Sequence, residues 1–146
     1  MMSHPPSSTA LIAYALRLAP GADLKHSLQA FADRHALTAG GLITAVGSLQ
    51  QICLRYAGQE AATCLPGPVE IVSLVGTIAP GGCHLHLAIA DAQGQVRGGH
   101  VMPGCLIHTT AEIVIAALPG LTFQRLPDAQ TGYRELVIHP TGVASP

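Results

Sequence analysis

The sequence has few charged residues for a domain surrounded by water. Asp, Glu, Lys and Arg make up 10% of its 146 residues, whereas soluble domains carry about 25%. Either a membrane or other subunits must cover the remaining apolar surface. A membrane helix needs roughly 20 consecutive apolar residues, and the longest uncharged stretches, 35–54 and 71–90, contain Gly, Ser, Thr, Gln or His. We therefore expect an obligate oligomer without a membrane span.

Lysine and aromatic residues are also scarce. Lys25 is the only lysine, six arginines are scattered along the chain, and the net charge is −1. Tight general binding to phosphate backbones needs clustered basic side chains. Aromatic residues make up 3% of the chain, which leaves few rings for stacking on the bases of single strands. We expect direct binding to nucleic acid to be weak.

The sequence also lacks cysteine pairs with CxxC spacing, and we expect no secretory signal peptide. The four cysteines are too sparse for a small disulfide scaffold, so we expect free, buried thiols at Cys53, Cys64, Cys83 and Cys105. The apolar segment 10–16 has no basic residues before it and ends at Arg17. Both observations favour a cytoplasmic protein.

What remains is the pattern of a single α+β domain over residues 11–139, with tails at 1–10 and 140–146. Asp23 can cap a helix over 24–37 because its carboxylate can accept from free amides of the first turn. Residues 58–68 are rich in turn-forming Gly and Pro. Many strands against one clear helix indicate a largely antiparallel sheet. The strands are predicted over 11–18, 42–49, 51–56, 69–78, 83–90, 95–102, 105–118, 121–126 and 134–139.

Among the eight histidines, His84 and His86 stand out by their spacing. Residues two apart on a strand project to the same face, with Cα atoms roughly 6.5 Å apart. This spacing suits two ligands of one metal ion. The alternative is that both rings only form hydrogen bonds with their neighbours.

The third candidate ligand, His100, depends on the register of the hairpin after His86. A three-residue loop, Ala92–Gly94, places His100 directly opposite His86 and on the same face. A two-residue loop places His100 on the other face, and a bulge at Gly98–Gly99 would also reset the register. Three imidazoles with one open position are typical of a Zn²⁺ site that accepts a ligand, although Ni²⁺ or Cu²⁺ also fits nitrogen ligands.

Glu112 is a candidate catalytic residue because it lies in the apolar stretch 109–117. A carboxylate buried there would be costly unless it were paired, and such a group can act as a general base. An ion pair with an arginine, or a hydrogen bond to Thr110, explains the same pattern.

Several motifs follow one another along the chain. They are Gly47–Gln51 leading to Leu54–Tyr56, Glu70–Ile78, His84-Leu85-His86-Leu87, Asp91 with Gly94, Gly98-Gly99-His100 and Thr109–Glu112. Together they resemble the plant-and-prokaryote conserved family, called the PPC or PCC domain, in its prokaryotic form. The resemblance covers most of residues 11–139 and implies a compact α+β domain with a largely antiparallel sheet of about seven strands, assembled as a homotrimer.

The resemblance also bears on function. Some prokaryotic members hold a metal through histidines that match His84, His86 and His100, and family members are often described as DNA-binding because plant relatives carry an AT-hook. This chain has no Arg-Gly-Arg-Pro hook sequence. Two functions follow: a metal-dependent protein that binds or acts on an unknown small molecule between subunits, or a regulatory module without catalysis that reaches DNA through partners.

Overall fold

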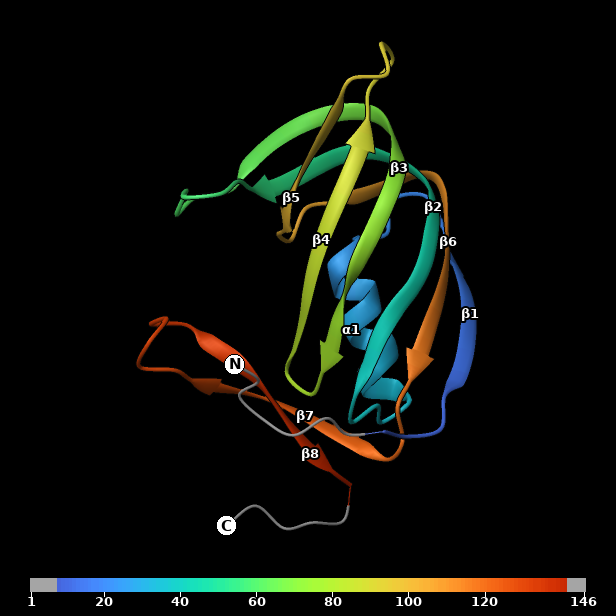
Figure 1. The fold of residues 1–146 in the computed structure, drawn as a ribbon. Helices are drawn as coiled ribbons and strands as arrows, with labels where there is room; N and C mark the ends of the chain where they lie inside the picture. The colour runs from blue at the N-terminus through green and yellow to red at the C-terminus, as the bar shows by residue number, and fades with distance from the viewer. Residues whose placement is uncertain (1–7, 142–146) are drawn as a thin grey trace.

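A computed structural model describes residues 8–141 of the chain, so most of the two predicted tails lies outside the described residues. Within these residues the chain forms one helix and eight strands (Figure 1). Their bounds are β1 (Ile12–Leu18), α1 (Leu24–Arg34), β2 (Gly40–Arg55), β3 (Thr63–Ala79), β4 (Gly82–Ala90), β5 (Val96–Val101), β6 (Leu106–Ala117), β7 (Leu121–Pro127) and β8 (Arg134–Pro140).

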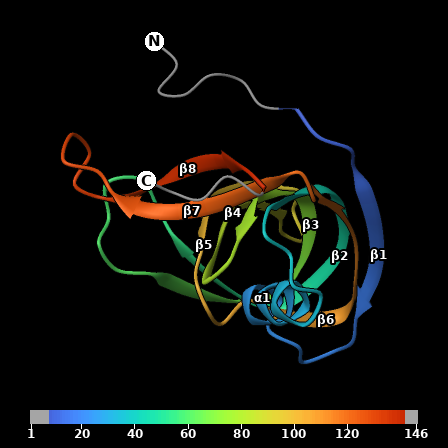
Figure 2. The ribbon, with the colours of Figure 1, turned by 90° about the horizontal axis from the view of Figure 1, so that it is seen from below.

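The strands form two antiparallel sheets rather than one. Six of them lie in the order β1-β6-β2-β3-β4-β5, and β5 also pairs with the end of β2, so that β2 to β5 form a closed ring of strands. β7 and β8 form a separate hairpin, which crosses one end of the curved sheet (Figures 1 and 2). The predicted α+β class and the antiparallel pairing are confirmed, but the strands are divided six and two.

The helix α1 begins where the sequence predicts and ends three residues early. The Asp23 side chain accepts a hydrogen bond from the His26 amide, as an N-cap does. Ala36 has a positive φ of 50°, which stops the helix before the predicted end at Leu37. α1 has 11 residues and is the one helix among residues 8–141. No helix there is long and apolar enough to cross a membrane.

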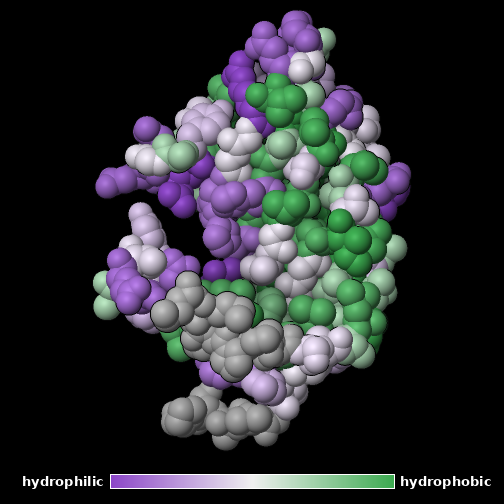
Figure 3. All heavy atoms as spheres, in the orientation of Figure 1, coloured by the Kyte–Doolittle hydropathy of each residue, from purple (hydrophilic) through white to green (hydrophobic). Residues whose placement is uncertain are grey.

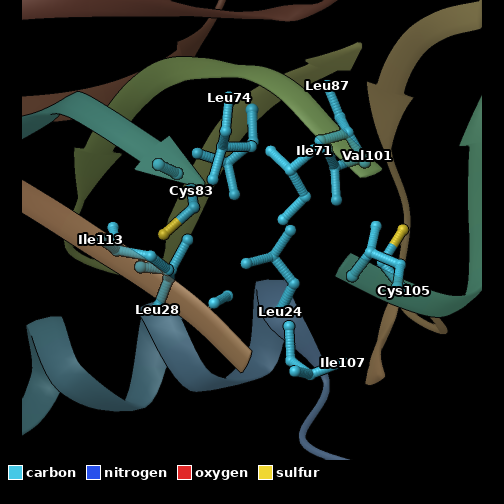
Figure 4. Packing of buried hydrophobic residues seen from close by; sticks show 14 of the residues in the cluster. Leu24, Leu28, Ile71, Leu74, Cys83, Leu87, Val101, Cys105, Ile107 and Ile113 are labelled. Carbon is cyan, nitrogen blue, oxygen red and sulfur yellow. The ribbon is translucent and has the colours of Figure 1, made fainter. Parts of the chain in front are cut away.

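The core lies between α1 and the concave face of the sheet (Figure 4). Leu24 and Leu28 point from the helix into a cluster of buried aliphatic side chains from the strands. Burying apolar side chains of this size stabilises the fold by roughly 1.5–3 kcal/mol each. The helix therefore anchors the inner face, and the outer face of the sheet stays free for other contacts. Strand residues of this cluster include Ile71, Leu74, Leu87, Val101, Ile107 and Ile113.

β2 and β3 are longer than predicted. The predicted break at Gln50 is an irregularity in register within one continuous strand. β3 begins at Thr63, inside the segment predicted as turns, and contains Pro66 and Pro68. Proline is tolerated in a strand where no neighbour needs its missing N–H, and β4 pairs with β3 only from Glu70 onward. The prolines thus occupy the part of β3 that has β2 as its single neighbour.

The prediction of four free thiols is wrong for two of them. The β2–β3 register places Cys53 opposite Cys64, and the two form a disulfide with Cα atoms 4.1 Å apart. Cys83 and Cys105 are free and buried, as predicted. Disulfides are uncommon in the reducing cytosol, so the cysteines no longer support the predicted cytoplasmic location.

Candidate metal centre

The hairpin β4–β5 brings the three candidate histidines together. The Asp91 amide donates to the Gln95 carbonyl, and Gly94 has a φ of 74°, which its lack of a side chain permits. The loop therefore has three residues, and His86 lies directly opposite His100. The predicted register is confirmed and its two-residue alternative is excluded.

Gly98 and Gly99 do not form the bulge that the sequence left open, since the β4–β5 register runs without a shift from Ala90 to His86. They allow close strand contacts instead. A Cβ on Gly98 would lie 2.9 Å from the Leu87 carbonyl oxygen, and a Cβ on Gly99 would lie 2.9 Å from that of Arg55. The two glycines let β5 fit between β4 and the end of β2, which fixes His100 from both sides.

The three rings converge on one small volume. The Nε2 atoms of His84 and His86 are 3.3 Å apart, and one ring nitrogen from each of the three histidines lies within 4.8 Å of the others. His100 Nδ1 is buried and has no hydrogen-bond partner among the described residues. A buried polar atom without a partner is costly, and a metal ion would provide one for an imidazole lone pair. The donor set therefore fits a divalent metal.

The surroundings keep two of these rings neutral. Partial burial, with the positive charge of Arg125 next in importance, lowers the pKa of His84. Burial and then the charge of Lys25 lower the pKa of His100 to about 4. A metal binds the neutral imidazole. The fold thus holds His84 and His100 in the protonation state that ligation requires.

Glu112 occupies a different place from the one expected. It is exposed on the outer face of β6, opposite Arg17 on one side and Val46 on the other. In the sheet order, β2 and β3 separate β6 from β4. The expectation of a buried carboxylate is wrong, because Glu112 is one of the β6 residues that face outward while the alternate residues fill the core.

Sequence reasoning missed the arginines beside the histidine cluster. A pocket of about 500 Å³ is lined by His84 and His100 together with Arg55, Arg125 and Arg134. Arg55 comes from β2, whereas Arg125 and Arg134 come from the β7–β8 hairpin, which is distant from β2 in sequence. Figure 3 shows the surface hollowed on this side, between the β7–β8 hairpin and the strands above it. No sequence pattern marks these three residues, since only the packing of the hairpin against the sheet joins them.

A model of the Plants and Prokaryotes Conserved (PCC) domain matches residues 6–119. Among curated proteins, the chain is 50% identical over 143 residues to the bifunctional protein GlmU of a Synechococcus species. It is 37% identical over 133 residues to AT-hook motif nuclear-localized protein 15 of Arabidopsis thaliana. These alignments cover 98% and 83% of this chain, but only 23% and 41% of the relatives. The chain thus spans less than half of either relative.

Two solved structures resemble the whole fold. A hypothetical protein from Salmonella has a TM-score of 0.91 at 47% identity, with 92% of this chain and 98% of that chain covered. A protein from Archaeoglobus fulgidus, described as metal-containing, has a TM-score of 0.78 at 26% identity, with 93% and 99% covered. Both comparisons extend beyond the family match at residue 119 and therefore include part of the β7–β8 hairpin.

Proposed function

Since the chain belongs to the Plants and Prokaryotes Conserved (PCC) domain family, we propose that it is a metal-dependent protein that binds or acts on a small molecule. His84, His86 and His100 would hold one divalent ion per subunit. The convergence of three ring nitrogens within 4.8 Å, beside a pocket of about 500 Å³, carries this proposal. The metal-containing relative from Archaeoglobus supports it.

Zinc is the metal we propose, because imidazole nitrogens suit it and three protein ligands leave a position for a fourth. Bound at this site, such an ion would act as a Lewis acid that polarises an oxygen of the bound molecule. The chain's own groups then have two tasks. The histidines hold the ion, and the pocket beside them receives and orients the molecule.

We further propose that the protein works as a homotrimer. The outer face of β2 and β3 carries four aliphatic side chains that are 53–55% exposed, Ile43, Val46, Val72 and Val75. Figure 3 shows hydrophobic residues gathered on the side of the molecule where β1, β2 and β3 lie. An apolar patch of this kind is typical of a subunit interface. It accords with a chain in which only 10% of residues are charged.

The trimer also bears on Glu112. Its exposed carboxylate lies on β6, on the same outer surface as Val46. Within one subunit, Glu112 does not belong to the cluster of possible metal ligands that the described residues 8–141 form. We propose that it serves as a proton acceptor only where a neighbouring subunit brings it to the pocket.

Replacement of one ligand tests the metal centre. His86→Ala should remove the bound metal and leave a folded protein, because His86 is exposed and fills no core position. Elemental analysis of the purified protein should find one metal ion per subunit in the wild type and almost none in the variant. His26→Ala, which removes an exposed histidine on α1, is the matched control and should keep its metal. Stoichiometric metal in His86→Ala would refute the site.

A regulatory module that reaches DNA through partners is the second candidate. The similarity to an AT-hook motif nuclear-localized protein favours it. The lone lysine and the net charge of −1 disfavour direct contact with DNA. Titration of a fluorescent DNA duplex in about 0.15 M salt, a concentration that separates weak from tight backbone binding, should show no tight complex. Metal-free protein that still forms the trimer would favour this second function, whereas nanomolar binding by the isolated protein would contradict indirect contact with DNA.

A further inference from the structure

The pocket beside the histidines carries more positive than negative charge. Its lining includes three guanidinium groups, those of Arg55, Arg125 and Arg134, and a single carboxylate, that of Glu135. The excess is two positive charges before any metal is bound. A site with a net charge of one sign attracts ligands of the other sign.

The guanidinium groups are not neutralised by carboxylates. In residues 8–141, their hydrogen bonds run to the Thr77 hydroxyl from Arg125, to the Arg125 carbonyl from Arg134 and to the Gln59 carbonyl from Arg55. Each of these bonds uses one of the five N–H donors that a guanidinium carries. The arginines therefore keep donors for a ligand, and the bonds that they make fix their orientation.

The arrangement joins the arginines to the metal centre. Arg55 is the direct cross-strand partner of His100, and Arg125 is bonded to Thr77, which lies opposite His84 in the β3–β4 ladder. Each of the two histidines is thus linked to one arginine through the sheet. A ligand in this pocket therefore meets two of the proposed metal ligands, His84 and His100, as well as the basic side chains.

We infer that the small molecule bound here is an anion, whose phosphate or carboxylate group is held by Arg125 and Arg134 while another part reaches the metal centre. The inference rests on the proposed metal-dependent function. The planar guanidinium matches the oxygens of both groups in a two-bond geometry. A pocket of about 500 Å³ has the size of a site for a metabolite rather than for a polymer. Tyr133 lines the pocket and is 69% exposed, so its ring can pack against the rest of the ligand.

Calorimetric titration of the metal-loaded protein with three probes tests the inference. Glycerol 3-phosphate and succinate represent the two anionic groups, and glycerol is the neutral control. At least one of the two anions should bind, and glycerol should not. The anion that binds more tightly identifies the group that the site prefers. If neither anion binds more tightly than glycerol, the inference is wrong.

Charge variants show whether the bound anion lies in this pocket. Arg125→Gln and Arg134→Gln should each weaken binding about tenfold or more, since a hydrogen bond between charged groups is worth about 1.5–3 kcal/mol. Glu135→Gln should strengthen it, because it removes the pocket's negative charge. Arg97→Gln removes the same charge from β5 outside this pocket and should change little. Equal affinity in all four variants would overturn the inference, provided that their melting temperatures match that of the wild type.

Metal content is measured on the same samples, which separates this inference from the proposed function. Arginine variants that keep one metal per subunit but no longer bind the anion support both the metal centre and the anion site. Wild-type protein that holds metal but binds neither anion refutes the anionic ligand and leaves the metal centre intact. Metal-free wild type that still binds an anion through the arginines refutes the metal centre and keeps the anion site.

Discussion

His100 is the residue on which the proposed metal centre depends most. It pairs with His86 on one side and with Arg55 on the other, so its backbone is held between two strands. Its Nδ1 is buried without a partner in the described part of the chain, and burial lowers its pKa to about 4. These features make His100 a preorganised ligand, because its ring is neutral and already in place before a metal binds.

Metal affinity should respond to pH through this residue and His84. A proton competes with the metal for an imidazole nitrogen, so acid weakens binding. Since the folded protein lowers the pKa of both rings below the ordinary 6.5, each ring is half-protonated only at a pH below that value. Zinc titrations between pH 8 and pH 4 should therefore show that the midpoint of their share of the loss lies below pH 6.5. Affinity that rises on acidification would contradict ligation by histidine.

At the scale of elements, the close approach of β3 to β4 supports the centre. Gly76 in β3 lies opposite Leu85 and has a φ of 154°. A Cβ at this position would lie 2.1 Å from the His84 carbonyl oxygen, which is far below a normal contact. The two strands can thus pair next to His84 only if residue 76 has no side chain.

Gly76→Ala should destabilise the protein by about 1–3 kcal/mol, from backbone strain and overpacking. Thermal unfolding should show a midpoint lower by roughly 3–10 °C for a domain of this size. Gly82→Ala is the control, because a Cβ there meets nothing within 4 Å and its φ is not positive. If Gly76→Ala and Gly82→Ala both unfold at the same temperature as the wild type, the close approach of β3 to β4 does not exclude a side chain at residue 76.

At the scale of the whole molecule, the outer surface has two distinct regions. One side carries the exposed aliphatic side chains of β2 and β3, and the pocket with the histidines and arginines lies between β4, β5 and the β7–β8 hairpin. β2 contributes to both regions, since Ile43 and Val46 lie in the apolar patch and Arg55, at the end of the strand, lines the pocket. Burial of the apolar patch against a neighbouring subunit therefore covers different residues from those that line the pocket.

Sedimentation equilibrium should give three times the 15.0 kDa mass of the chain. Val72→Asp should dissociate the trimer, since it places a charge on the exposed apolar face of β3 and burying an unpaired charge between subunits is costly. Val96→Asp is the control, because Val96 is at least as exposed as Val72 but lies on β5. A wild-type monomer at micromolar concentration, or a trimer that tolerates Val72→Asp, would contradict the proposal.

The amino-acid sequence by itself determined the elements whose signals are local. The Asp23 cap, the positive φ of Gly94 and the alternation of the β4–β5 hairpin depend on neighbours a few residues away. The position of His100 opposite His86 was one of the arrangements that the sequence allowed, because a strand alternates its side chains with a period of two and a three-residue loop puts both on one face. The histidine cluster was therefore predictable as an alternative, and the structure selected it.

Only the tertiary structure decided what depends on long-range packing. The bond between Cys53 and Cys64 depends on the β2–β3 register beyond an irregularity, and Glu112 faces outward because β6 buries its alternate residues. The arginine pocket exists because the β7–β8 hairpin crosses the end of the sheet. The pocket joins Arg55 to Arg125, which are 70 positions apart, and even the 11 positions between Cys53 and Cys64 leave their pairing to the strand register. No local pattern records them, since chain packing rather than sequence spacing sets the distance between their side chains.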